Sequence, residues 1–227
     1  MSSLSAEQLA VLESWYDDPD LFDREMWPDD PPEPWQSKAS RMVCDKDRVA
    51  IRSGHGVGKT AWLARRIIWW GTTRNPWKVG VTAPSSSQMY DALWSELAKW
   101  HAKMPDGFRE LFVWSTERFE WKEEPAVSFA VAKTARRETP DALAGLHSEN
   151  MLYIIDEAPG VDDIIFETAR GAMSTLGSKT IMTGNPTQLT GYFFDAFHKN
   201  REFWQGVKVS CYESSHTNWK EIDQWKE

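Results

Sequence analysis

A glycine-rich run that ends in Lys-Thr, Ser53–Thr60, is the clearest chemical signal in the chain. Its three glycines allow a tight turn whose backbone N–H groups converge on phosphate oxygens, and a helix that starts behind them adds the positive end of its dipole. Lys59 is expected to reach the β- and γ-phosphates of a nucleoside triphosphate, and the Thr60 hydroxyl to ligate Mg²⁺. A chance Gly-Lys-Thr in an ordinary turn is disfavoured, because a strand pattern precedes the run and a helix pattern follows it.

Alternatives stay open at some positions around this loop. Ser53 replaces the first glycine of the consensus G-x-x-x-x-G-K-[ST], and every other consensus position matches. His55 can touch a phosphate, but a side chain that points to solvent is favoured. Arg52 can reach the γ-phosphate from the same chain, and a structural ion pair is an equal alternative. The predicted binding positions are Ser53, Gly54, His55, Gly56, Val57, Gly58, Lys59 and Thr60.

Two acids follow an apolar strand pattern, Met151–Ile155. At the carboxyl end of a central strand, Asp156 and Glu157 are expected to face the phosphate loop. Asp156 fits a carboxylate on the Mg²⁺ side of the site, and Glu157 fits the base that orients and deprotonates the attacking water. Four other acidic pairs are interpreted as solvated surface, because none of them ends an apolar strand: Asp17-Asp18, Asp29-Asp30, Glu123-Glu124 and Asp162-Asp163.

Alternating strand and helix patterns predict the architecture that positions these residues. Strand patterns cover Arg48–Ile51, Lys78–Thr82, Met151–Ile155, Lys179–Thr183 and Val207–Cys211, and a hairpin is predicted from Glu117–Trp121 and Ala126–Ala132. Helical spacing covers Gln36–Met42, Lys59–Trp70, Ser86–Lys103, Asp162–Ser174 and Tyr192–Lys199. The alternation predicts a three-layer α/β fold with a mostly parallel central sheet covered on both faces.

The N-terminal residues 1–34 are interpreted as an addition to a domain spanning residues 35–227. Ser5–Tyr16 has the pattern of a helix capped by Ser5, and the acidic, proline-rich stretch Asp17–Pro34 is predicted to be an arm outside the core. The first residues lack the features of a secretion signal, and the two cysteines are too few for a disulfide framework or a zinc site. A cytoplasmic, reduced protein is expected.

The net charge of −8 argues against a domain that grips a nucleic-acid backbone tightly by itself, although a local basic patch can make brief contacts. Arg65, Arg66, Lys99 and Lys103 are candidates for such contacts, and solvated helix faces are favoured for each. The 14 tryptophans follow no fixed period and lie apart from basic clusters. They are therefore interpreted as core residues rather than as a base-stacking platform.

The long separation between Lys59 and Asp156 contains a predicted strand, a long helix and a hairpin. It leaves room for an extra strand between the phosphate-loop strand and the Asp-Glu strand. This arrangement resembles the RecA-like class of P-loop NTPases, in which the hydrolytic glutamate is built in. Signalling GTPases are a poorer match, because their guanine-reading Asn-Lys-x-Asp has no counterpart here.

Together with the loop and the acid pair, three further motifs resemble the ATPase domain of the large terminase subunit of tailed bacteriophages, over roughly Phe22 to His216. Trp35-Gln36 resembles the adenine-contacting segment of that family. Val81-Thr82-Ala83-Pro84 with Ser85 and Gln88 resembles its strand-end motif, and Met182-Thr183-Gly184-Asn185-Pro186 its coupling motif. The last motif implies that Asn185 senses the γ-phosphate, and an ordinary turn is the alternative for this motif taken alone.

The resemblance implies an ATP- and Mg²⁺-dependent motor that packages double-stranded DNA into a procapsid in the host cytoplasm. It also implies partners: DNA held transiently, a portal protein, a small terminase subunit and further copies in a ring. Some relatives carry an arginine that acts in trans shortly before the Asp-Glu strand. Here that role falls to Arg136 or Arg137, or does not exist, and a solvated basic loop is an equal alternative.

The family's RNase H-like nuclease domain has no room in this sequence, so a shortened chain without nuclease activity is expected. Two other functions stay open. A helicase-like nucleic-acid ATPase shares the loop and the acid pair but needs a second RecA-like domain. A nucleotide-dependent switch hydrolyses slowly, which the built-in Glu157 disfavours.

Overall fold

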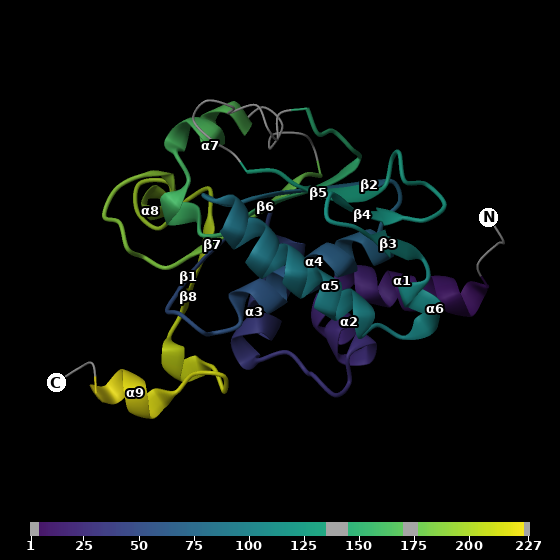
Figure 1. The fold of residues 1–227 in the computed structure, drawn as a ribbon, viewed down its shortest axis with the longest axis horizontal. Helices are drawn as coiled ribbons and strands as arrows, with labels where there is room; N and C mark the ends of the chain where they lie inside the picture. Colours follow the sequence, from purple (N-terminus) through teal and green to yellow (C-terminus); the bar gives the residue numbers. More distant parts are fainter. Residues whose placement is uncertain (1–4, 135–144, 170–176, 225–227) are drawn as a thin grey trace.

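An eight-stranded sheet forms the centre of the protein in the computed structural model, which describes residues 5–134, 145–169 and 177–224 (Figure 1). The strand order is β3-β4-β5-β2-β6-β7-β1-β8. In this spatial order, every neighbouring pair from β5 to β8 is parallel, including the pairs that β2 and β1 make. The strands β3 and β4 pair antiparallel at the edge, with β4 next to β5. The predicted mostly parallel α/β sheet is therefore confirmed. The strands are β1 Arg48–Ser53, β2 Trp77–Thr82, β3 Phe112–Trp114, β4 Arg118–Trp121, β5 Phe129–Ala132, β6 Asn150–Ile155, β7 Lys179–Gly184 and β8 Gln205–Val209.

The strand β7 lies between β1 and β6, so an extra strand separates the glycine-rich loop from the Asp-Glu pair. Its register places Thr183 beside Ile51 and Met182 beside Ile155. This is the RecA-like order, but the extra strand does not come from the long stretch between Lys59 and Asp156, as the spacing suggested. That stretch forms β2 to β5 on the far side of β6, and β7 follows the acid pair in the chain.

Helices cover both faces of the sheet. The α-helices of the described residues are α1 Ala6–Asp17, α2 Pro19–Met26, α3 Pro34–Asp45, α4 Lys59–Thr73, α5 Ser95–Ala102, α6 Asp106–Arg109, α7 Asp163–Ala169, α8 Tyr192–Ala196 and α9 Trp219–Gln224. The predicted helix Ser86–Lys103 starts with a π-helical segment, Gln88–Trp94, before α5. The predicted end of the helix at Ser174 lies outside the described residues.

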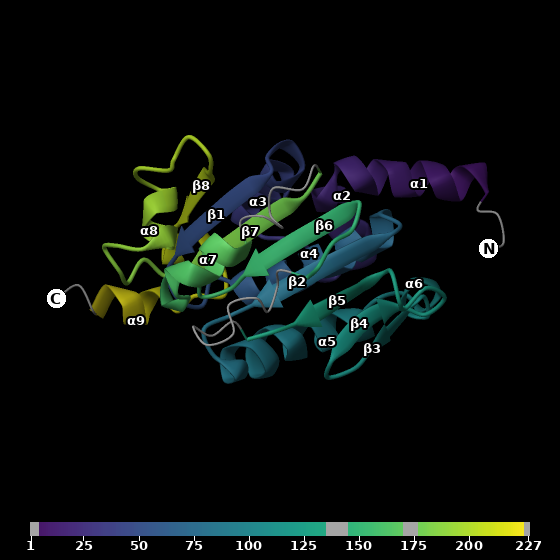
Figure 2. The same cartoon turned by 90° about the horizontal axis from the view of Figure 1, so that it is seen from above.

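The two faces carry separate hydrophobic clusters, as alternation along each strand requires. Val49 and Ile51 of β1 pack with residues of α1 to α5, whereas Ala50 packs with residues of α7 and α8. Figure 2 shows the same sheet from above, with α7 in front of the strands and α4 behind them. The predicted three-layer arrangement is therefore observed. Among the helices of the described residues, none has the length and apolar character of a membrane span.

The N-terminal helices belong to the core, which corrects the prediction of an arm over Asp17–Pro34. Phe22 and Met26 of α2 are at most 2% exposed and pack in the cluster around α4. Asp18 caps α2, and Pro19 occupies its first turn, where a missing N–H is tolerated. Acids and prolines suggested a linker, but here Asp18 and Pro19 start a helix that buries Phe22 and Met26. Ser5 caps α1 as predicted.

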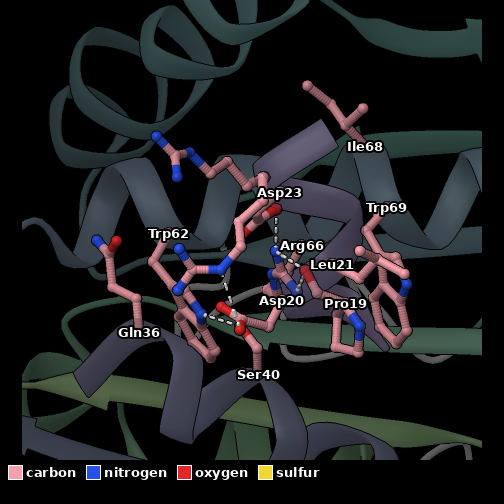
Figure 3. Close-up of polar contacts among 12 residues, drawn as sticks. Pro19, Asp20, Leu21, Asp23, Gln36, Ser40, Trp62, Arg66, Ile68 and Trp69 are labelled. Atoms are coloured by element: carbon pink, nitrogen blue, oxygen red, sulfur yellow. Dashed lines mark hydrogen bonds and ion pairs between the residues drawn. The ribbon is translucent and has the colours of Figure 1, made fainter. Parts of the chain in front are cut away.

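A fully buried ion pair joins α2 to α4. The carboxylate of Asp23 accepts a hydrogen bond from Arg66, and neither side chain is exposed (Figure 3). Arg66 also donates to the Pro19 carbonyl at 3.4 Å and lies over the rings of Trp62 and Trp69. The helix that follows the glycine-rich loop is thus bound to the N-terminal helices by charge as well as by apolar packing.

Most of the 14 tryptophans are buried, as predicted, and several surround arginines of the core. The Arg65 guanidinium lies 3.7 Å from the ring centroid of Trp100, and Arg74 lies 3.8 Å from that of Trp70. Arg65 and Arg66 are themselves buried, so the solvated helix face favoured for them is wrong, and burial also disfavours them as DNA contacts. Within the described residues, Trp219 is the tryptophan that remains exposed, at 49%.

The buried pair predicts a large loss of stability on removal of one partner. Asp23→Ala leaves the Arg66 charge buried and unpaired, so the free energy of unfolding in urea should fall by about 3–5 kcal/mol. Arg24→Ala, which removes a half-exposed partner of Asp20, should cost less than about 1 kcal/mol. Equal effects of the two substitutions would contradict the structural role given to the buried pair.

Candidate functional site

The loop between β1 and α4 has the backbone shape that its glycines predict. Gly56 and Gly58 adopt left-handed φ values of 74° and 87°, which residues with a Cβ rarely reach. A Cβ on Gly54 would lie 2.0 Å from the Cys211 thiol, which packs against the loop from the end of β8. Lys59 is the first residue of α4, so the loop ends at a helix N-terminus. This geometry can bind an anion through backbone N–H groups.

Two side chains of α3 donate hydrogen bonds to the backbone of the glycine-rich loop. The indole N–H of Trp35 donates to the Val57 carbonyl at 3.1 Å, and Gln36 Nε2 donates to the Gly58 carbonyl at 3.1 Å. Gln36 Oε1 also accepts from the Glu33 backbone N–H. Trp35 and Gln36, predicted to contact adenine, are therefore buried supports of the loop, and only Gln36 also lines the neighbouring groove.

The ammonium of Lys59 lies at the centre of the site. Its Nζ donates to Ser53 Oγ at 3.1 Å, to the Gly54 carbonyl at 3.2 Å and to Asn185 Oδ1 at 2.7 Å. Burial lowers the pKa of Lys59, and the carboxylates of Glu157 and Asp156 act in the opposite direction. Ser53, in place of the consensus glycine, thus supplies a hydroxyl that holds this cation.

Asp156 lies directly beyond β6, in a buried position beside β7. Its Oδ1 accepts from Thr183 Oγ1 at 2.5 Å and from the Glu157 backbone N–H at 3.0 Å. Burial raises the pKa of Asp156, while these two hydrogen bonds and the charge of Lys59 lower it. The Thr183 hydroxyl therefore helps to keep the carboxylate ionised in a place where desolvation opposes ionisation.

Glu157 has a left-handed backbone, with φ of 48°, which is uncommon for a residue with a Cβ. Burial and the neighbouring Asp156 carboxylate raise its pKa, and the charges of Lys59 and His55 lower it. A carboxylate with a raised pKa is a better proton acceptor than an ordinary one. The backbone and the electrostatics of Glu157 therefore fit the base that the sequence predicts.

Asn185 joins β7 to the tip of the glycine-rich loop. Its Oδ1 accepts from Lys59, and its amide nitrogen lies 2.9 Å from both ring nitrogens of His55. His55 is exposed, as favoured from the sequence, yet its ring contacts Asn185 rather than pointing freely into solvent. The structure thus brings the predicted loop, the acid pair and the coupling motif together at the carboxyl ends of β1, β6 and β7.

Of the three predicted arginines, Arg52 lies within the residues that the structure describes. Arg52 packs its guanidinium over the Phe197 ring, 4.8 Å from the centroid, at the end of α8. Among the residues that the structure describes, Arg52 makes this aromatic contact and none of them forms the ion pair considered for it. Arg136 and Arg137 lie outside the described residues. Thr60, the second residue of α4, is partly exposed at the helix start, where its hydroxyl was predicted to ligate Mg²⁺.

A groove of about 560 Å³ opens beside the loop. Gln36, Gly58 and Ala61 form its wall next to the start of α4, and Ser215 and His216 come from beyond β8. A groove of this size can hold a nucleoside. Reasoning from the sequence missed Glu33, Cys211 and His216 in and around this site, because no motif marks them and only the fold brings them to the loop.

No family model matches the chain. A probable large terminase subunit of Enterobacteria phage P7 is 28% identical over 158 residues, covering 68% of this chain and 32% of that protein. The chain therefore spans about a third of the length of this relative.

Solved structures agree in fold. The large terminase of a thermophilic bacteriophage has a TM-score of 0.65 at 14% identity, over 87% of this chain and 50% of that protein. The complex of that terminase with ADP has a TM-score of 0.64 at 14% identity, over 85% of this chain and 47% of that protein. The ATPase domain of the Thermus phage P74-26 large terminase has a TM-score of 0.59 at 14% identity, over 86% of this chain and 85% of that domain. The predicted resemblance and the RecA-like fold are confirmed.

The Thr183–Asp156 bond predicts a measurable shift in ionisation. Thr183→Val removes a hydrogen bond that lowers the pKa of Asp156, so this pKa should rise further above the ordinary value, and the carboxylate should be lost at higher pH as the solution is acidified. Carboxyl ¹³C NMR titration measures this directly. Thr180→Val, at the other end of β7, is the matched control. An unchanged Asp156 titration in Thr183→Val would contradict the proposed influence of the hydroxyl.

Proposed function

We propose that this chain is the ATPase motor domain of a phage large terminase, which hydrolyses ATP to move double-stranded DNA into a procapsid. One observation carries the proposal: Lys59, the Asp156-Glu157 pair and Asn185 meet at the ends of three adjacent parallel strands. A loop alone can bind a phosphate. A loop combined with a carboxylate base on a nearby strand, and with a polar side chain at the end of the strand between the loop and the base, is suited to hydrolysis.

In this proposal the triphosphate of ATP lies over the loop, and the adenosine extends into the groove beside Gly58. Backbone N–H groups from Gly54 to Thr60 and the Lys59 ammonium neutralise the phosphate oxygens. A hydroxyl and a carboxylate are donors that suit Mg²⁺, which would be held by Thr60 directly and by Asp156 through water. Bound there, the cation would neutralise charge on the β- and γ-phosphates.

Glu157 is the proposed general base. Its raised pKa suits the acceptance of a proton from the water that attacks the γ-phosphate, and Lys59 stabilises the charge that develops on the transferred group. Arg136 or Arg137 of a neighbouring subunit is proposed to add a cation in trans. Arg52 is the candidate in cis, and reaching the phosphates would require its guanidinium to leave the Phe197 ring.

Asn185 is the proposed sensor of the γ-phosphate. In the structure it accepts a hydrogen bond from Lys59, so a triphosphate that recruits the Lys59 ammonium would compete for this bond. Release of Asn185 would remove a hydrogen bond that ties the end of β7, and the segment that follows it, to Lys59. This competition supports coupling between the nucleotide state and movement of the segment that follows β7.

The remaining parts of the proposal come from the family resemblance. Residues 35–227, with the N-terminal helices packed on them, are proposed to form the motor, and the longer relatives are proposed to carry the nuclease domain beyond it. Double-stranded DNA, a portal protein, a small terminase subunit and other copies in a ring are the proposed partners, in the host cytoplasm. The acidic chain suits weak DNA contacts repeated by several subunits.

Substitution at the base separates binding from hydrolysis. Glu157→Gln should retain ATP binding within about threefold while lowering turnover by roughly a hundredfold or more, because the amide cannot accept the proton. Lys59→Ala should lose binding as well. Steady-state phosphate release and calorimetric ATP titration measure the two effects, with Glu149→Gln at an exposed position as the control. Ordinary turnover in Glu157→Gln would remove this residue as the base.

A ring motor predicts activity that depends on protein concentration. If a neighbouring subunit supplies an arginine, the ATPase rate per molecule should rise with concentration, and Arg136→Ala with Arg137→Ala should abolish the rise. The matched control is Arg201→Ala, at an exposed position beyond α8. A rate that is flat with concentration and indifferent to both arginines would exclude the trans assignment and favour Arg52. Partner-dependent binding with negligible turnover at every concentration would favour the switch.

A further inference from the structure

The segment that follows β8 returns to the groove and is fastened there by Glu33. Glu33 Oε1 accepts from the Ser215 backbone N–H at 3.1 Å and from its hydroxyl at 2.5 Å. The same oxygen lies 3.6 Å from His216 Nε2. Glu33 is also the N-cap of α3, in a capping box with Gln36. One carboxylate thus ties the end of the domain to the helix that supports the phosphate loop.

The imidazole of His216 lies beside the last glycine of the loop. Its Cδ2 is 3.9 Å from the position that a Cβ on Gly58 would occupy, and Gln36 Nε2 is 3.1 Å from the same point. The His216 side chain is nevertheless 67% exposed. Its backbone is anchored, since its N–H donates to the hydroxyl of the buried Ser214 at 3.2 Å. An anchored backbone therefore presents a flat, accessible ring to the groove.

The position of the groove determines what this ring can meet. Gly58 and Ala61 flank Lys59 at the start of α4, so a ligand whose phosphates lie on the loop has its nucleoside next to this wall. Planar bases stack favourably on aromatic rings, and a histidine ring also offers nitrogens for hydrogen bonds. We propose that His216 contacts the nucleoside of the bound nucleotide and favours nucleotides over bare polyphosphate, with Glu33 as its positioning residue. This inference rests on the proposed nucleotide site.

The nucleoside contact therefore comes from the end of the domain, far in sequence from every motif of the phosphate site. Gln36 reaches both the loop and the groove, but each end of its amide already makes a hydrogen bond within the protein. His216 has the exposed ring that Gln36 and the buried Trp35 lack. Recognition of the nucleoside thus falls to a segment that Glu33 ties to the start of α3.

The test compares two ligands that share the phosphates and differ in the nucleoside. Calorimetric titrations with ATP and with inorganic tripolyphosphate, both with Mg²⁺, are carried out on the wild type, His216→Ala, His216→Phe and Glu33→Gln. Loss of one stacking contact should weaken ATP binding about tenfold in His216→Ala and leave tripolyphosphate binding unchanged. His216→Phe should retain most of the ATP affinity because it keeps a ring. Glu33→Gln should fall between, because it keeps an acceptor for Ser215 but loses the charge beside His216.

His147→Ala, at another exposed histidine, is the control for the substitution itself, and retained tripolyphosphate binding shows that each variant has a folded loop. Unchanged ATP binding in His216→Ala would overturn the inference. Equal loss of ATP and tripolyphosphate would also overturn it, because His216 would then act by supporting the loop. Equal affinity of the wild type for the two ligands would reject the nucleoside contact and leave the phosphate site intact. A wild type that binds neither ligand would reject the proposed function itself.

Discussion

The buried ammonium of Lys59 is the charge around which the carboxyl edge of the sheet is arranged. A desolvated cation is costly unless it is paired and hydrogen-bonded, and here three acceptors from the loop and from β7 surround it. The carboxylates of Asp156 and Glu157 supply opposite charge from β6. The order β6-β7-β1 brings these acceptors and carboxylates to one cation. Under the proposed function, the same order places a phosphate-binding group next to a base.

The position of that cation depends in turn on α4, which is held from several sides. Arg66 of α4 pairs with Asp23 of α2. Arg65 of α4 donates to the Asp30 carbonyl at 2.8 Å, and its guanidinium stacks on the Trp100 ring. Trp35 and Gln36 of α3 donate hydrogen bonds to two backbone carbonyls of the loop that precedes α4. A loop supported in this way keeps its N–H groups oriented without a ligand. Binding of an anion therefore costs less free energy for ordering the loop.

The groove beside Gly58 shows how distant segments complete the site. Glu33 begins α3 and Ser215 follows β8, yet a short hydrogen-bond network joins them at the mouth of the groove. Gln36, which forms a capping box with Glu33 and donates to the Gly58 carbonyl, links this network to the loop. The segment that follows β8 is therefore placed to respond to what occupies the proposed nucleotide site, as Asn185 is proposed to do on the other side of Lys59.

The sequence by itself determined the local chemistry: the Ser53–Thr60 loop, the Asp156-Glu157 pair at a strand end, the Ser5 cap and the alternating α/β pattern. These features depend on neighbouring residues, because turn geometry, helix starts and burial periodicity repeat over a few positions. The tertiary structure alone decided that α2 is buried, that β7 separates β1 from β6, that Trp35 supports the loop, and that Glu33 meets Ser215 and His216. Each of these depends on partners far apart in the chain, such as Asp23 with Arg66, whose charges resemble solvated surface until the fold encloses them together.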